Sequence, residues 1–125
     1  MYCHRVHLEK LLRTRDTPPD CVRLAGGAAR SRVWCQLFAD ILGLPVERLE
    51  ARETGTLGCA ILAAAGSGAY PSLQSAARAM SPVGERFTPR PEAGARYERR
   101  YALYKKLVEC LDPLWGEIQG VIEGT

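Results

Sequence analysis

The stretch VRLAGGAARSRVWCQLFADILGLPVE, residues 22–47, decides the fold. It starts as a short apolar run, passes through the adjacent Gly26 and Gly27, and then shows apolar side chains at intervals of three and four. That spacing predicts an amphipathic helix over residues 31–42, ended by the Gly-Leu-Pro sequence that follows. The apolar face expected in the core is Trp34, Leu37, Phe38 and Ile41, and the opposite polar stripe is Arg32, Gln36 and Asp40.

The apolar run at residues 21–25 predicts one strand, and the alternation of apolar and polar residues at 45–50 predicts another. Strand, helix and strand joined by short links form a βαβ unit, whose strands are parallel and whose crossover is right-handed. Parallel strands are normally buried inside larger sheets. With two clear strands and one weaker candidate around Phe87, the chain is expected to be a piece of a larger domain.

Helical patterns lie on both sides of the βαβ unit. The expected helices cover residues 2–13, a segment capped by Thr54 or Thr56 that ends at residues 66–68, a short segment from Ser72, and a long segment from Pro91 or Glu92. The long helix should bury Tyr97, Tyr101, Tyr104, Val108 and Leu111, Pro113 should stop or kink it, and residues 114–124 should add a weaker helical tail. The predicted fold class is therefore α/β, helix-rich with a small parallel sheet.

The composition argues against several classes of function. The 125 residues suit one compact domain, 46% are hydrophobic, 25% are charged, and the net charge is only +3, too low to point to nucleic acid. No apolar stretch is long enough to cross a membrane, and the first ten residues do not form a signal peptide. Five cysteines without a CxxC pair predict reduced thiols in a cytoplasmic protein and no metal site.

The double glycine has two interpretations from the residues alone. A glycine after a strand accepts positive φ and exposes no Cβ, and a following helix would aim N–H groups and a positive dipole end at the same place. Such a turn suits a phosphate or the edge of a nucleotide. However, GGAARS matches neither standard phosphate-binding fingerprint, so the pattern alone favours a plain strand-to-helix turn with small residues.

A resemblance to a known family adds to this picture. Residues 22–47, followed by ETGTLGCAILAAAGSGAYPSLQSA at residues 53–76, resemble the C-terminal nucleotide-binding region of the FGGY carbohydrate kinases. The flanking CHRVHLEKLL and YERRYALYKKLVECLDPLW are similar to helices of the bacterial L-xylulose-kinase-like branch. The resemblance covers nearly the whole chain, in order and in spacing, and identifies residues 1–125 as a partial C-terminal domain of an FGGY-type kinase.

The resemblance implies the fold and the ligands. The family has two actin-like, ribonuclease-H-like domains, with ATP and Mg²⁺ in the cleft between them, and a sugar hydroxyl accepts the γ-phosphoryl group. The turn at Gly26, Gly27 and Ala28 then lies beside the adenosine and the α-phosphate, and Ser31 lies near the adenine. The expected partners are therefore ATP or ADP and, in the full-length enzyme, a sugar, with no nucleic acid and no membrane.

The resemblance also implies what this chain lacks. The catalytic aspartate and the phosphate-binding loop of the family belong to its N-terminal domain, so no catalytic residue is expected here and the chain alone should be inactive. The family sheet normally has further strands before the helix at residues 2–13. Without them the strand at residues 22–24 would be an open edge, and self-association is expected.

Two functions follow from these observations. In the first, the chain is the ATP-binding part of a carbohydrate kinase that acts on a pentulose such as L-xylulose. In the second, it is a stand-alone module that binds a nucleotide or a protein without catalysis.

Overall fold

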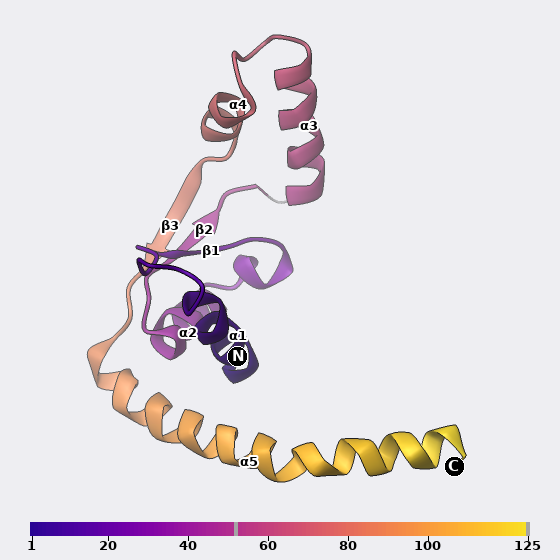
Figure 1. Cartoon of the computed structure of the whole chain (residues 1–125). Helices are drawn as coiled ribbons and strands as arrows, with labels where there is room; N and C mark the ends of the chain where they lie inside the picture. The colour runs from indigo at the N-terminus through magenta and orange to yellow at the C-terminus, as the bar shows by residue number, and fades with distance from the viewer. Residues whose placement is uncertain (52, 125) are drawn as a thin grey trace.

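The computed structural model describes residues 1–51 and 53–124, and its elements follow the expected order. They are α1 (Tyr2–Leu12), β1 (Val22–Leu24), the 3₁₀ turn η1 (Gly27–Arg30), α2 (Arg32–Leu42), β2 (Val46–Leu49), α3 (Thr54–Gly66), α4 (Leu73–Met80), β3 (Val83–Phe87) and α5 (Pro91–Glu123). Figure 1 shows α1 and α2 together beneath the sheet, the α3–α4 hairpin above it, and α5 running out from the body.

The three strands form one mixed sheet in the order β1-β2-β3. β1 and β2 are parallel, with Val22 opposite Val46, as the βαβ pattern predicted. β3 is antiparallel to β2, with Phe87 opposite Val46, so the expectation of a purely parallel sheet is wrong. The reason is the connection, because α3 and α4 pack on each other as a hairpin that turns the chain back before it re-enters the sheet (Figure 1).

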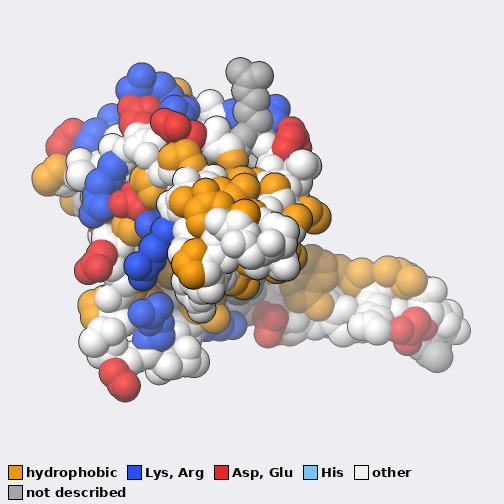
Figure 2. All heavy atoms as spheres, turned by 90° about the horizontal axis from the view of Figure 1, so that it is seen from above, with side chains coloured by type: hydrophobic (Ala, Val, Ile, Leu, Met, Phe, Trp, Pro, Cys, Tyr) orange, Lys and Arg blue, Asp and Glu red, His pale blue; other side chains and the backbone are white. Residues whose placement is uncertain are grey.

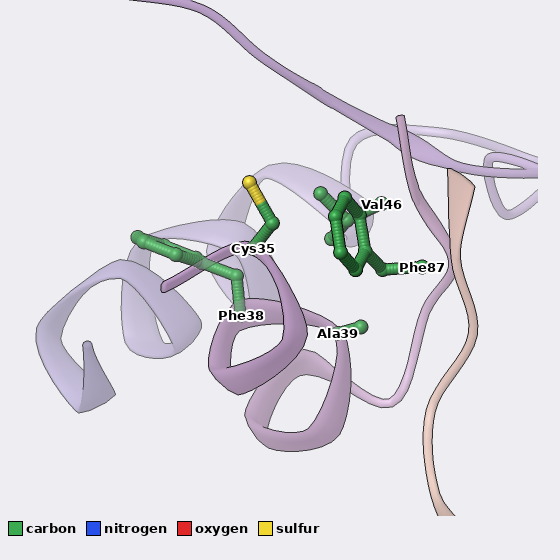
Figure 3. Close-up of a cluster of buried hydrophobic side chains, with 5 residues drawn as sticks. All are labelled: Cys35, Phe38, Ala39, Val46 and Phe87. Carbon is green, nitrogen blue, oxygen red and sulfur yellow. The ribbon is translucent and has the colours of Figure 1, made fainter. Parts of the chain in front are cut away.

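The core lies between α2 and the sheet. Cys35, Phe38 and Ala39 of α2 pack with Val46 of β2 and Phe87 of β3, as Figure 3 shows. Phe38 and Ile41 of the expected core face are buried, but the face is rotated about the helix axis, because Trp34 is 48% exposed and Asp40 of the expected polar stripe is buried. The small side chains of Cys35 and Ala39 let the helix approach the sheet closely, and the bulkier indole is left at the margin.

Serine side chains cap the N-termini of α2 and α4. Ser31 caps α2 by accepting a hydrogen bond from the backbone N–H of Trp34, and Gly43 ends it in the left-handed region at φ 68°. Ser72 opens α4 with a capping box that it shares with Ser75. The expectation that Thr54 or Thr56 caps α3 is wrong, because the cap position is Glu53, which makes no side-chain capping bond.

Helix α5 is more continuous and more exposed than its sequence pattern predicts. It begins at Pro91 as expected, but it continues through Pro113 to Glu123 without a stop. Tyr97 and Tyr101 are buried against the body, whereas Val108 and Leu111, expected in the same buried stripe, are each 42% exposed. Within the described part of the chain, no helix combines the length and apolar character needed to cross a membrane.

Candidate nucleotide site

The glycine turn joins β1 to α2. Gly26 has φ 77° and ψ −160°, a backbone conformation that residues with a Cβ rarely adopt. The 3₁₀ turn that follows is closed by a hydrogen bond of 3.2 Å from the N–H of Ala29 to the carbonyl oxygen of Gly26. The chain therefore changes direction sharply at the strand end, and glycine is required at the first of the two adjacent positions.

A pocket of about 510 Å³ lies beside this turn. It occupies the carboxyl ends of the parallel strands β1 and β2, the place where open α/β sheets characteristically bind ligands. Its volume is in the range of small-molecule sites. Its lining consists of Gly26, Ala29, Arg30, Arg48, Leu49, Glu50 and Ala51.

The residues predicted for the site fall into two groups. Gly26 lines the pocket, whereas Gly27, Ala28 and Ser31 are not part of its lining. Gly27 and Ala28 are exposed, and a Cβ added at Gly27 would meet no atom within 4 Å. Open space at Gly27 is compatible with a ligand held against the backbone, because the protein itself does not fill that space.

The predicted helix-dipole contribution is wrong in its geometry. The 3₁₀ turn separates Gly27 from α2, which begins only at Arg32. The Oγ of Ser31 is already used, since it accepts a hydrogen bond of 3.3 Å from the N–H of Trp34. The N-terminus of α2 is thus occupied by its own cap, and the site depends on the turn and the strand ends instead.

Positive charge borders the pocket. The Nη2 of Arg30 lies 3.0 Å from Oε1 of Glu53, and the Nη2 of Arg48 lies 3.8 Å from Oε2 of Glu85. Both are solvent-accessible ion pairs of a kind that contributes little to stability. The guanidinium groups can therefore exchange these partners for a phosphate at low cost.

Arg48, Glu50 and Ala51 are pocket residues that the sequence analysis missed. A signal for them was present, since a parallel βαβ unit brings the ends of its two strands to the same edge of the sheet. The register pairs Leu24 with Arg48, which sets the end of β2 directly beside the glycine turn. The predicted strand at residues 45–50 was therefore sufficient to find them.

Cys35 supports the turn from the core side. Its Sγ donates a weak hydrogen bond of 3.5 Å to the carbonyl oxygen of Ala29. Burial raises the pKa of the Cys35 thiol, so the group stays protonated at neutral pH. It is a packing residue behind the site and not a nucleophile.

Metal ligands are not gathered at this pocket. Over residues 1–51 and 53–124, no three His, Cys, Asp or Glu side chains cluster closely enough to hold a metal ion. Glu50 brings a carboxylate to the lining, but one carboxylate does not make a magnesium site. The described residues of the pocket therefore do not hold a Mg²⁺ ion by themselves.

Solved structures define the class of fold. The chain superposes on a xylulose kinase from Lactobacillus acidophilus with a TM-score of 0.76 at 21% identity, which covers 91% of this chain and 24% of that one. A xylulose kinase from Rhodospirillum rubrum gives 0.70 at 30% identity, covering 92% and 23%. The fold is part of the actin-like ATPase fold of the sugar kinases.

Sequence comparison identifies the family. Residues 1–67 match the C-terminal domain model of the FGGY family of carbohydrate kinases, and the chain belongs to that family. It is 32% identical over 119 residues to L-xylulose/3-keto-L-gulonate kinase of Escherichia coli, which covers 95% of this chain and 24% of the relative. It is 36% identical over 109 residues to xylulose kinase of Staphylococcus epidermidis, which covers 87% and 22%. The chain thus spans about a quarter of the length of these relatives.

Proposed function

We propose that this chain forms the nucleotide-facing part of an ATP-dependent pentulose kinase, which transfers the γ-phosphoryl group of ATP to a hydroxyl of a ketose of the L-xylulose type. The observation that carries the proposal is the turn at Gly26 and Gly27, which borders a pocket of about 510 Å³ at the strand ends of a sugar-kinase fold. The similarity to L-xylulose/3-keto-L-gulonate kinase over 95% of this chain supports the substrate class.

The turn and the two arginines have separate roles in this proposal. Gly26 makes the bend, while Gly27 and Ala28 leave the backbone open for the adenosine and the α-phosphate. Arg30 and Arg48 approach from the sides of the pocket and can donate hydrogen bonds to phosphate oxygens. Ser31 would contribute from its capping position, because its hydroxyl hydrogen can still be donated to an adenine acceptor.

The chemistry of transfer requires groups beyond this pocket. ATP supplies the phosphoryl group, while a base must accept the proton of the sugar hydroxyl and cationic groups must neutralise the phosphates. The lining offers two arginines and Glu50, and no cluster of metal ligands occurs among the described residues. We therefore assign nucleotide binding and orientation to this chain and the base to another part of the enzyme.

Nuclear magnetic resonance titration tests the site directly. ATP and ADP added to the chain should shift the backbone amide resonances of residues 26–31 and 48–51, and the resonances of α4 and the outer half of α5 should remain in place. Binding should be weak, because one wall of a cleft makes only part of the contacts. Amide shifts confined to another surface, or no shifts at millimolar nucleotide, would refute the proposed site.

The same titration distinguishes part of a kinase from a stand-alone binding module. A module that functions alone should bind a nucleotide tightly without the rest of a kinase. Weak nucleotide binding at the turn supports the hypothesis that the chain is part of a kinase. Submicromolar binding by the isolated chain would favour the stand-alone module.

A further inference from the structure

The end of β2 brings a carboxylate to the pocket beside the glycine turn. Glu50 directly follows β2, and it lines the pocket together with Gly26. Its backbone is fixed to the loop before β3, because the N–H of Glu50 donates a hydrogen bond of 3.3 Å to the carbonyl oxygen of Pro82. The proposed ligand is an anion, so a negative side chain at this place needs a role that the phosphates do not explain.

The Glu50 carboxylate differs from the acids around it in the sheet. Figure 2 shows basic and acidic side chains next to one another over the body of the molecule. The neighbouring acids are paired in this way, Glu47 with Arg23 and Arg86, Glu53 with Arg30, and Glu85 with Arg32 and Arg48. Within residues 1–51 and 53–124, no side chain forms a hydrogen bond or an ion pair with the carboxylate of Glu50. The described part of the protein therefore leaves its oxygen atoms available as acceptors.

Gly84 of β3 makes room for the Glu50 side chain. A Cβ added at Gly84 would lie 2.8 Å from Cγ of Glu50 and 3.3 Å from the carbonyl oxygen of Arg48, so a larger residue would displace the Glu50 side chain. The β2–β3 register also shifts at this point, between Glu47 and Leu49, as it does at a β-bulge. Bulges re-aim side chains and are frequent beside active sites. The position of Glu50 is thus set by β3.

The place of Glu50 in the βαβ unit suits a ribose. In dinucleotide-binding βαβ units, a glycine-rich turn follows the first strand, and a carboxylate about twenty residues further on accepts a hydrogen bond from a ribose hydroxyl group. Here Gly26 and Gly27 follow β1, and Glu50 follows β2, which is parallel to β1. Because the ends of parallel strands meet at one edge of the sheet, the turn and the carboxylate share one pocket.

The charges of the lining orient a nucleotide in this pocket. Arg30 and Arg48 attract phosphates, whereas an ionised carboxylate repels them and can only accept hydrogen bonds. The donors that ATP offers to a carboxylate are its ribose hydroxyl groups and the 6-amino group of adenine. Since the proposed site puts the adenine beside Ser31, the ribose is the part of the nucleotide left for Glu50.

We propose that Glu50 is a ribose-binding residue, which accepts hydrogen bonds from the 2′- and 3′-hydroxyl groups of the bound nucleotide, and that Gly84 is the positioning residue that seats it. This role rests on the proposed nucleotide site and adds to it a preference for ribonucleotides. The glycine turn provides the backbone contacts, and the end of β2 provides the discrimination between a ribose and a sugar without these hydroxyl groups.

Nucleotide titrations of the whole chain, followed by nuclear magnetic resonance, test the role of Glu50. ATP should bind about tenfold more tightly than 2′,3′-dideoxy-ATP, which is the effect of losing one charge-assisted hydrogen bond. Glu50→Ala should remove this preference, and Glu50→Gln should retain part of it, because an amide oxygen still accepts hydrogen bonds. Glu117→Gln, on the exposed surface of α5, is the control and should keep the preference of the parent chain.

A double-mutant cycle tests the role of Gly84. Gly84→Ala should reduce the preference for ATP in the parent chain, but it should not change the affinity of the Glu50→Ala chain for either nucleotide, because both changes act through one carboxylate. Gly116→Ala, which adds a Cβ in open space on α5, is the control. If Gly84→Ala weakens both nucleotides equally in both backgrounds, Gly84 supports the fold and does not position Glu50.

Three other results would overturn the ribose assignment. If ATP shifts the amide resonances of residues 26–31 but Glu50→Ala keeps the preference, Glu50 does not contact the ribose, although the nucleotide site stands. If Glu50→Ala instead removes a preference for ATP over inosine triphosphate, the carboxylate contacts the adenine amino group. If ATP shifts no resonance at residues 26–31 or 48–51, the nucleotide site itself is refuted, and the role of Glu50 with it.

Discussion

Asp40, in the last turn of α2, holds Arg90, the residue immediately before α5. Its Oδ1 accepts a hydrogen bond of 2.8 Å from the backbone N–H of Arg90, and its Oδ2 accepts bonds of 3.0 and 2.6 Å from the guanidinium Nε and Nη2. Gln36 donates a further bond of 2.9 Å to Oδ1. These bonds fix the start of α5 to the helix that covers the sheet.

Removal of the Asp40 carboxylate should loosen this junction. We expect Asp40→Ala to lower the free energy of unfolding by about 2 kcal/mol, since hydrogen bonds to a charged group are lost and the backbone N–H of Arg90 loses its acceptor. Arg90→Ala should be more damaging, because it leaves a buried carboxylate without its cation. Urea denaturation measures both, with Glu117→Ala on exposed α5 surface as the control.

The same carboxylate should make stability depend on pH. Burial pushes the pKa of Asp40 upward, but the hydrogen bonds from Arg90 and Gln36 outweigh it and leave the pKa below its ordinary value. The stabilisation is therefore complete above the unfolded value of about 3.9 and is lost as the pH falls through the folded value. Asp40→Asn should flatten this acid limb in thermal melts, and an unchanged slope would contradict the assignment.

Tyr101 anchors α5 on α1 in a second way. Its hydroxyl donates a hydrogen bond of 2.7 Å to Oε2 of Glu9, and the guanidinium carbon of Arg5 lies 4.1 Å from the ring centroid. Burial and the bond to Glu9 raise the pKa of Tyr101 to about 12. Its stabilisation should be complete below the unfolded value of about 10 and should be lost between about 10 and 12.

Tyrosinate absorbance measures this effect. The chain has five tyrosines, and Tyr101→Phe should remove the component that ionises last while it costs about 1 kcal/mol of unfolding free energy. Tyr104→Phe is the matched control, because Tyr104 lies one turn further along the same helix. Loss of the late component in the Tyr104 variant instead would show that another ring is the protected one.

Much of this fold follows from local sequence. The helix at residues 32–42, its serine cap and its glycine end could be predicted because all three depend on neighbours within a few residues. The burial of Asp40 could not, because it depends on Arg90, which is fifty residues away in the chain. The antiparallel direction of β3 could not be predicted from local sequence either, since it depends on how α3 and α4 pack.

The candidate site shows the same division. Gly26 could be selected from the sequence because a strand followed by two glycines requires an unusual backbone conformation there. The 3₁₀ turn after it could not, and the helix-dipole argument failed for that reason. Trp34 was placed in the core by its spacing, but periodicity identifies only a broad face and not its centre.

The two glycines of the turn should respond differently to substitution. Gly27→Val should leave the fold intact, because Gly27 is not at positive φ and an added Cβ meets no atom within 4 Å. Its new methyl groups should nevertheless remove nucleotide binding in calorimetry. Gly26→Ala should instead cost about 1–3 kcal/mol of stability, because Gly26 combines a positive φ with a ψ of −160°, a conformation open almost only to glycine.

A control separates binding from general damage. Gly66→Val adds the same side chain at the end of α3, also in open space, and should leave nucleotide binding unchanged. Equal nucleotide affinity in the parent and Gly27→Val chains would remove Gly27 from the site.

Catalysis is the last prediction. We expect the isolated chain to release no ADP above background when it is given ATP, Mg²⁺ and either L-xylulose or D-xylulose. The resemblance to the FGGY kinases implies that the catalytic base and the phosphate-binding loop belong to the N-terminal domain of the family, and loss of such groups typically costs orders of magnitude in rate. A coupled assay for ADP measures this, with a full-length xylulose kinase as the positive control. Sugar-dependent ADP release that Gly27→Val abolishes and Gly66→Val preserves would show instead that this quarter-length chain carries its own catalytic base.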